Sequence, residues 1–457
     1  MSTLINKGIA FIISALLLMS GNVMAQENVL DQYIREAFKN NEGLHQQQFQ
    51  LEKTLYALKE ARSLFLPNIS LQGSYLKSDG GRTIDLPVGD LLNPLYSSLN
   101  QLTQTSSFPQ IKNESVQLNP DNYYDAKFHT TLPLINAEIY YNNKIKKQLM
   151  TRQQAAINVY KRELVKNIKD AYYQYYQAGK AIDIYKNSLS LVNENIRINE
   201  SLLRNGVRNG TALTRSQTEK QKIEALITQA ENNKLNAQYY FNFLLNKPQS
   251  SDITIDTLAF SDDAVLQMPG AKDFGGREEL QQLKTATEAY KLNTQMQRSS
   301  IIPKLNTFLD LGSQGFDFKY NNKTQYYMWG LSLQWDLFAG GQHRYKTQQA
   351  LADVHAIEAQ YSETEKALQL QLSQSLNNYN TAVANYQSAR SQLQLANKYY
   401  SDQFKVYKEG QLLYIELVDA LNQLTNTQVQ LSIAKATVQT ALAEIERNQA
   451  TYPINNN

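Results

Sequence analysis

The chain has 457 residues, with 45 Lys and Arg against 42 Asp and Glu and a formal net charge of +3. It contains no cysteine, which excludes disulfides, thiolate metal sites and a lipidated N-terminal cysteine. The near-balance of charge argues against nucleic acid as a partner.

The first 25 residues have the features of a secretory signal peptide. Lys7 gives a positive start, residues 9–19 are almost wholly apolar, and Ala25 follows Val23 at the spacing of a cleavage site. The alternative is a short buried helix. We expect a secreted chain that begins near Gln26. No later segment has the roughly 18 consecutive apolar residues of a membrane-spanning helix, so any membrane insertion is expected to use β-strands.

Long helices are predicted along the rest of the chain. Apolar residues recur at steps of four and three across 164–196 and again across 368–400, a period of 3.5 that is typical of coiled coils. Each long helix is expected to run to a glycine, Gly206 or Gly410, and to be about 100 Å long. The long helices are predicted over 139–206 and 341–410, and shorter ones over 28–64, 211–245, 278–299 and 411–447.

Four candidate strands lie between these helices, and each alternates apolar with polar residues. They are predicted over 69–75, 124–132, 305–312 and 327–337. An apolar face with aromatic residues near its ends, opposite a face with Asp, Lys and His, is typical of a lipid-facing barrel strand. The residues expected to face lipid in the last strand are Tyr327, Trp329, Leu331, Leu333 and Trp335. The alternative is an ordinary half-buried sheet.

The order of helix, two strands and helix occurs twice. Residues 61–69 resemble 297–305, and residues 208–213 resemble 408–413, in the same order along the chain. The main difference in length is a segment over 76–122. The predicted division is a signal peptide (1–25), a first repeat (26–249), an inter-repeat linker (250–277), a second repeat (278–447) and a C-terminal tail (448–457).

Four strands are too few to close a barrel. An open sheet edge within lipid leaves backbone groups without hydrogen-bond partners, and about eight strands give a barrel filled by its own side chains. Three copies, with twelve strands, leave room for an aqueous lumen. The strands therefore indicate an oligomeric channel.

Further motifs accompany the duplicated plan. They are Arg-Ser-x-x-x-Pro at 62–67 and 298–303, the turn over 337–341, and the tip over 407–410 followed by Ile-Glu-Leu-Val-Asp-Ala-Leu over 415–421. Taken together, the plan and these motifs resemble the TolC family of outer-membrane efflux proteins. The resemblance extends from about residue 28 to 447. It implies an α+β membrane protein in which three copies form a twelve-stranded outer-membrane β-barrel, continued in the periplasm by an α-helical coiled-coil barrel.

The resemblance also implies a function. The chain would be the passive exit duct of a tripartite efflux pump or type I secretion system, a homotrimer joined through a periplasmic adaptor protein to an inner-membrane transporter. Such a duct needs no cofactor and has no catalytic residues.

Particular residues match the family's gating positions. Glu416 and Asp419 are three apart on one helix face and match an acidic ring at the periplasmic constriction, which would favour cations and bind multivalent ones. The alternative for both is a solvated helix face. Tyr407 matches a gate contact, whereas Ser216 and Leu412 replace an acidic and a basic residue. The tip is therefore expected to close by other contacts or less tightly.

The hairpin tips are the expected contacts for an adaptor, although a glycine after a helix is also an ordinary C-terminal cap. The tip residues are Asn209, Gly210, Thr211, Glu409, Gly410 and Gln411. The segment 76–122, rich in Ser, Asn, Gln and Pro, is predicted as an external loop that either narrows the exit or is disordered and without a role.

Other classes of protein fit less well. The four histidines form no metal-binding spacing, and no nucleophile elbow or phosphate-binding loop is present, which argues against an enzyme. A non-conducting coiled-coil scaffold, in the periplasm or on the surface, explains the helices but not the alternating strands. A periplasmic adaptor usually has one helical hairpin, and a simple porin lacks long helices.

Overall fold

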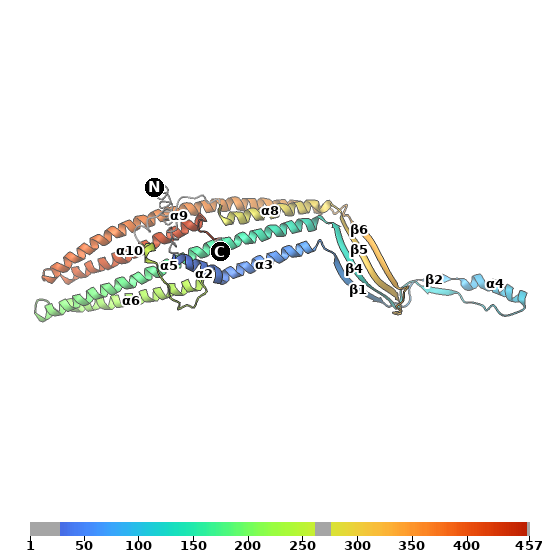
Figure 1. Ribbon diagram of the computed structural model, residues 1–457, viewed down its shortest axis with the longest axis horizontal. Coiled ribbons are helices and arrows are strands. Elements are labelled where there is room, and N and C mark those ends of the chain that lie inside the picture. The colour runs from blue at the N-terminus through green and yellow to red at the C-terminus, as the bar shows by residue number, and fades with distance from the viewer. Residues whose placement is uncertain (1–27, 261–275, 455–457) are drawn as a thin grey trace, which may run out of the picture. The chain divides into compact units, whose positions relative to one another are not determined.

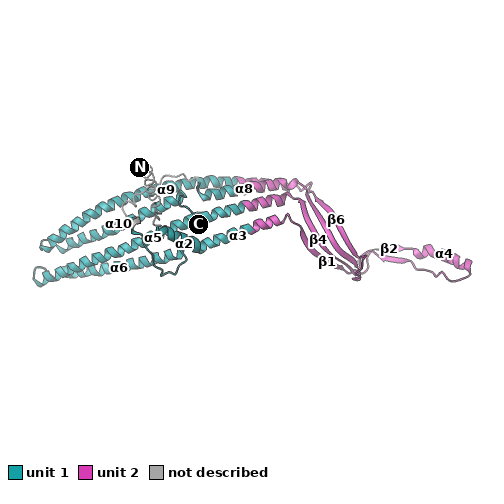
Figure 2. Cartoon of the chain, viewed as in Figure 1, with its two compact units in different colours: residues 1–55, 148–288, 355–457 teal, residues 56–147, 289–354 magenta. Residues whose placement is uncertain are grey.

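The computed structural model describes residues 28–260 and 276–454, which form two compact units (Figure 2). The first unit takes in residues up to 55, 148–288 and 355–457, and the second takes in 56–147 and 289–354. The predicted signal peptide lies outside the described residues, as does the part of the predicted linker over 261–275. The predicted division into repeats stays a prediction, because the two units are not consecutive stretches of the chain.

Helices form the first unit, and four of them, α3, α5, α8 and α9, contribute residues to both units. Within the first unit, α5 and α6 form one antiparallel hairpin and α9 and α10 form another (Figure 1). The bounds are α2 (Val29–Asn40), α3 (Glu42–Ser63), α5 (Ala137–Arg204), α6 (Thr211–Leu244), α8 (Glu278–Arg298), α9 (Gln342–Lys408) and α10 (Tyr414–Asn448), with the short 3-10 helices η1 (Thr257–Phe260) and η3 (Ser299–Ile301). No helix in the described residues is both long and apolar enough to cross a bilayer.

The predicted single helix over 28–64 is wrong in one respect, because Asn41 divides it. This residue is extended rather than helical, and its side-chain amide donates to the Leu244 carbonyl at 2.8 Å. Its Oδ1 accepts from the Leu44 amide at 2.9 Å, which starts the next helix, and from the Tyr160 hydroxyl at 2.9 Å. The same tyrosine hydroxyl would lie 1.9 Å from a Cβ at Gly43, so a larger side chain there would displace it.

Three apolar clusters hold the first unit together. One joins α2, α5 and α6, where the ring of Phe241 lies 5.0 Å from that of Tyr33 in an edge-on contact. A second, around Val192, Tyr400 and Leu417, lies next to the turns of the two hairpins. The third is a seam of tyrosine, alanine and branched side chains between α9 and α10. The small and aromatic residues at heptad spacing are therefore the core positions of these hairpins.

The second unit contains an antiparallel sheet in the order β1-β4-β5-β6 (Figure 1). Its strands are β1 (Asn68–Leu76), β4 (Tyr123–Ile135), β5 (Lys304–Phe316) and β6 (Gln325–Gln334), close to the predicted ranges. In the described residues, β1 and β6 have a partner strand on one side only. The sheet therefore presents two open edges.

The register places the apolar residues of the four strands on the same face of the sheet. Leu71 is opposite Phe128, Phe128 is opposite Leu311, and Leu311 is opposite Tyr327, so one apolar row crosses the whole sheet. Directly opposed residues share a face. The adjacent row places His129 opposite Asp310, whose carboxylate also lies 3.2 Å from the amino group of Lys127. One face is apolar and exposed, and the other carries a network of charges.

The segment 76–122, predicted as a loop or a disordered stretch, contains defined structure. It holds β2 (Thr83–Leu86), α4 (Val88–Thr103) and β3 (Glu114–Gln117), with β2 and β3 paired antiparallel. Its polar composition concealed a helix, which includes Pro94 within its first two turns.

Candidate functional site

The turns of the two helical hairpins end in the same local geometry. In the first, Gly206 has φ +69° and donates its amide to Leu203 at 3.0 Å, while Val207 donates to Leu202 at 2.9 Å. Gly410, with φ +74°, and the residue after it make the matching pair of hydrogen bonds in the second. These are glycine caps at helix ends, a conformation that costs little only for glycine. We call residues 205–210 the first tip and residues 409–413 the second tip.

Arg208 joins the two tips. Its guanidinium donates to the Gly410 carbonyl at 3.2 Å and to the Leu412 carbonyl, and it lies over the ring of Tyr407, 4.8 Å from the ring centre. Charged donors of this kind make stronger hydrogen bonds than neutral ones, and the flat guanidinium suits both carbonyls and an aromatic face. Sequence reasoning missed this residue, because its acceptors are backbone carbonyls that no side-chain motif reveals.

Tyr407, the predicted gate contact, is fully buried between the hairpins. Its hydroxyl donates to Oδ1 of Asn199 on α5, and its ring lies 5.6 Å from that of Tyr414. The amide of Asn199 continues the chain of contacts by donating to the Ala212 carbonyl at 3.3 Å. Burial raises the pKa of Tyr407, while Arg208 and Asn199 act in the opposite direction. The tyrosine therefore stays a neutral donor at neutral pH.

Ser216 and Leu412, the two residues that depart from the family pattern, make different kinds of contact. Ser216 is fully buried, but its hydroxyl donates to the Leu213 carbonyl of its own helix at 2.7 Å. Leu412 packs its side chain against the second apolar cluster and offers only its carbonyl to Arg208. The polar contact between the hairpins thus uses Tyr407, at a family position, together with Arg208 and Asn199, which were not predicted from the sequence.

The predicted acidic pair lies in the first turns of α10, and both residues are exposed. A carboxylate oxygen of Glu416 accepts from the Leu413 amide at 3.3 Å, so this side chain also caps its helix. Asp419 follows one turn later on the same exposed face. Of the predicted docking residues, Gly410 is half-buried, and the exposed ones are Asn209, Gly210, Thr211, Glu409 and Gln411.

The predicted lipid-facing side chains of β6 are also exposed, with Trp329 at 66% and Leu333 at 63% of full accessibility. Trp335 lies just beyond the strand, and its ring nitrogen donates to the Ile301 carbonyl at 3.0 Å. Leu71 and Phe128 extend the exposed apolar surface across the sheet. A row of exposed apolar side chains that continues from strand to strand marks a surface that another apolar phase or molecule covers.

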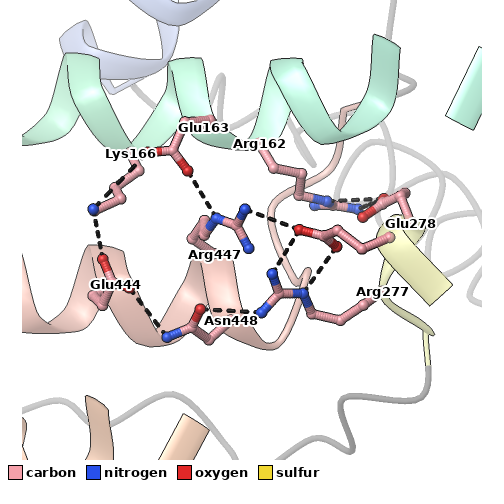
Figure 3. A network of polar contacts seen from close by, with 9 residues as sticks. Arg162, Glu163, Lys166, Arg277, Glu278, Glu444, Arg447 and Asn448 are labelled. Atoms are coloured by element: carbon pink, nitrogen blue, oxygen red, sulfur yellow. Dashed lines mark hydrogen bonds and ion pairs between the residues drawn. The ribbon is translucent and has the colours of Figure 1, made fainter. Parts of the chain in front are cut away.

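A second polar cluster, remote from the tips, was not predicted from the sequence (Figure 3). Arg277, only 2% exposed, binds both carboxylate oxygens of Glu279 and donates to Asn448 at 3.1 Å. Arg447 lies 2.9 Å from the same glutamate and 2.9 Å from Glu163. This network ties the start of α8 to α5 and to the end of α10. Among the described residues, no cluster of acidic and histidine side chains could hold a metal ion.

Beside this network, α5, α9 and α10 line a polar cavity of about 660 Å³. Asp170 lies in its wall, and one of its carboxylate oxygens is buried without a hydrogen-bond partner among the described residues. Burial raises the pKa of Asp170 to about 6, while Lys166 lowers it and Glu444 raises it further.

Replacement of Asp170 by asparagine is expected to stabilise the protein at pH 7, by about 1–2 kcal/mol after allowance for partial exposure. The carboxyl binds its proton more tightly in the folded chain, so wild-type stability should fall as pH rises from about 3.8 to about 6. Asp170→Asn should lack this component, and Asp183→Asn, on an exposed part of α5, should keep it. Unfolding free energies across this pH range provide the measurement. Parallel curves for wild type and Asp170→Asn would contradict the assignment.

Comparisons with known proteins find the same combination of long helices and a four-stranded sheet in outer-membrane proteins. Residues 275–448 match the family model for outer membrane efflux protein. This segment is less than half of the chain, and it is similar to outer membrane efflux proteins. The resemblance noted in the sequence is thereby confirmed for the second half of the chain. No curated protein matches the sequence significantly.

Solved structures extend the similarity to nearly the whole chain. The channel CusC has a TM-score of 0.76 at 14% identity, covering 93% of this chain and 92% of that one. The open state of the Neisseria gonorrhoeae MtrE outer membrane channel has a TM-score of 0.73 at 15% identity, with 92% and 88% covered. The Vibrio cholerae outer membrane protein VceC has a TM-score of 0.72 at 13% identity, with 92% and 95% covered. The chain therefore has the fold of these outer-membrane proteins, and the predicted α+β fold class is confirmed.

Proposed function

We propose that three copies of this chain form an outer-membrane exit duct, which conducts substrates passively from the periplasm to the exterior. The observation that carries the proposal is the four-stranded sheet with an exposed apolar face and two open edges. A sheet that faces lipid must satisfy every backbone group, and it can do so only by closing. Three copies joined from β6 to β1 give twelve strands, enough for a barrel with an open lumen.

In this proposal the helical hairpins continue the duct into the periplasm, and their tips form its inner entrance. The exposed residues of both tips then meet a periplasmic adaptor protein, which links the duct to an inner-membrane transporter. CmeC of Campylobacter jejuni and MtrE are each described as an outer membrane channel, and the fold they share with this chain supports the proposal. A non-conducting coiled-coil scaffold does not account for the apolar sheet face.

The oligomeric state is the first test. The protein is expected in the outer-membrane fraction, to need detergent for extraction, and to have the mass of three chains by native mass spectrometry. A detergent-free, water-soluble protein, or a folded monomer in mild detergent, would favour the scaffold instead.

The acidic pair at the start of α10 provides a second test. In a trimer, Glu416 and Asp419 would contribute six carboxylates to the entrance, which should favour cations and bind multivalent ones. The double variant Glu416→Gln/Asp419→Asn is expected to lose both cation selectivity and block by a trivalent cation in planar bilayers. Glu416→Gln also removes the carboxylate that caps α10. Asp419→Asn alone therefore serves as the variant that keeps this cap.

The matched control for that experiment is Asp402→Asn, which removes an exposed carboxylate from α9. It should leave selectivity and block unchanged. If the double variant behaves like this control, the carboxylates belong to a solvated helix face and the duct has its selectivity elsewhere.

A further inference from the structure

The ordered segment 76–122 leaves and re-enters the sheet at a single point. Leu76 ends β1 and pairs with Tyr123 at the start of β4. Between them, β2 and β3 form a two-stranded ribbon that carries α4. In the trimer proposed above, each copy would therefore present one α4 from the same rim of the barrel.

The polar face of α4 is bound to its own chain. The side chain of Asn93 donates to the Ile111 carbonyl at 2.9 Å and accepts from the Ile111 amide at 2.8 Å. Two turns later, Asn100 makes the same pair of hydrogen bonds with Phe108, at 2.8 and 3.0 Å. A Cβ at Gly89 would lie 2.6 Å from the Ile111 carbonyl oxygen, so the helix and the returning segment are in close contact.

The apolar face of α4 points away from these contacts. Leu91, Leu95 and Leu102 are 72%, 54% and 82% exposed. At about 100° per residue they lie within about 40° of one another around the helix. A helix on a soluble protein normally turns its apolar face inward. Here the arrangement is reversed, so the leucine stripe packs against nothing within residues 28–260 and 276–454.

The sequence around the stripe favours a second copy of this chain as that partner. Residues 91–111 contain no Asp, Glu, Lys or Arg, so identical helices can approach one another without repulsion. A helix that lies on a membrane surface usually carries Lys or Arg on its polar face, whereas the only charged residue of α4 is Asp90. The stripe is also continuous with the proposed junction between copies, because β1, one of the open edges, leads directly into this segment.

We propose that the α4 helices of the three copies pack together through the stripe of Leu91, Leu95 and Leu102, and thereby narrow the exit of the duct. This inference rests on the proposed function, since it needs a trimer. It gives the 76–122 segment a definite role, as a self-associating cap rather than an idle loop.

The absence of cysteine makes a direct test possible. Leu95→Cys in the full-length protein is expected to form disulfide-linked pairs of chains under mild oxidation. Gln101→Cys is the matched control, since Gln101 is exposed on the same helix and lies about 120° around it from Leu95. It should stay uncrosslinked. A Leu95→Asp/Leu102→Asp variant should remain trimeric and pass a larger current than the wild type.

The outcomes separate this inference from the proposed function. A trimer that conducts but gives no crosslink at Leu95→Cys would overturn the cap and leave the duct. A fluorophore on Leu95→Cys that brominated lipid quenches in that trimer would also overturn the cap, and would place the stripe on the membrane surface. Failure of the wild type to form trimers would instead refute the proposed function.

Discussion

Replacement of Arg208 by alanine is expected to increase the current through the purified protein, because the tips lose the side chain that joins them. The arginine makes two hydrogen bonds from a charged group to carbonyls of the second tip and stacks on Tyr407. Such hydrogen bonds contribute about 1.5–3 kcal/mol. Their loss should shift the balance from joined to separated tips by about tenfold to a hundredfold.

The matched control is Arg215→Ala, which removes the same charge from an exposed position on α6. The current of Arg215→Ala should equal that of the wild type. This control therefore separates the loss of a positive charge near the entrance from the loss of the Arg208 contact between the tips. Arg208→Lys should give an intermediate current, since lysine keeps the charge but lacks the flat, forked guanidinium. Equal currents for Arg208→Ala and the wild type would mean that the tips are held by the surrounding apolar cluster alone.

Replacement of Glu279 by alanine is expected to lower the free energy of unfolding by about 3–5 kcal/mol. This glutamate accepts from the nearly inaccessible Arg277 and pairs with Arg447, so its loss leaves one buried guanidinium without its carboxylate. Breaking a buried pair costs more than the pair contributes, because the remaining charge stays away from water. Denaturant unfolding of the detergent-extracted protein measures the effect.

The chain offers an exposed pair of the same geometry as a control. Arg197 binds both carboxylate oxygens of Glu194, at 2.9 and 2.7 Å, on the surface of α5. Glu194→Ala is expected to leave stability unchanged within error, since water replaces the partner. The double variant Arg277→Met/Glu279→Leu should recover much of the loss, because it leaves neither charge behind. If the Glu279→Ala protein is as stable as the Glu194→Ala protein, the mutation does not leave the guanidinium of Arg277 buried without a partner.

The sequence predicts the sheet and the helices well, because both depend on periodicity. Alternation with period two assigned Leu71, Phe128, Leu311 and Tyr327 to the apolar faces of their own strands, and the register shows that these faces lie on the same side of the sheet. The heptad pattern likewise set the extents of α5 and α9 to within a few residues. These signals extend over many residues, so no single position decides them.

The features that the sequence did not predict depend on individual hydrogen bonds, which hydrophobic periodicity does not reveal. Asn41 breaks a helix because its side chain binds Leu244, which is 203 residues away in the sequence. The contact of Arg208 uses backbone carbonyls, and the buried network around Arg277 joins charges from three helices. Helix α4 was missed because its asparagines, serines and proline are typical of loops, although here the asparagines bind the backbone of the returning segment at Phe108 and Ile111.

The central claim is that three copies close the open edges of the sheet into a conducting duct. Single-channel recording from the purified trimer in planar bilayers tests it most directly, with the wild type and Arg208→Ala compared under the same conditions. The account predicts discrete, cation-selective current steps from both proteins, larger or more frequent in Arg208→Ala. Membrane-inserted trimers of both proteins that carry no current would contradict it, since opening the tips would then reveal no continuous lumen.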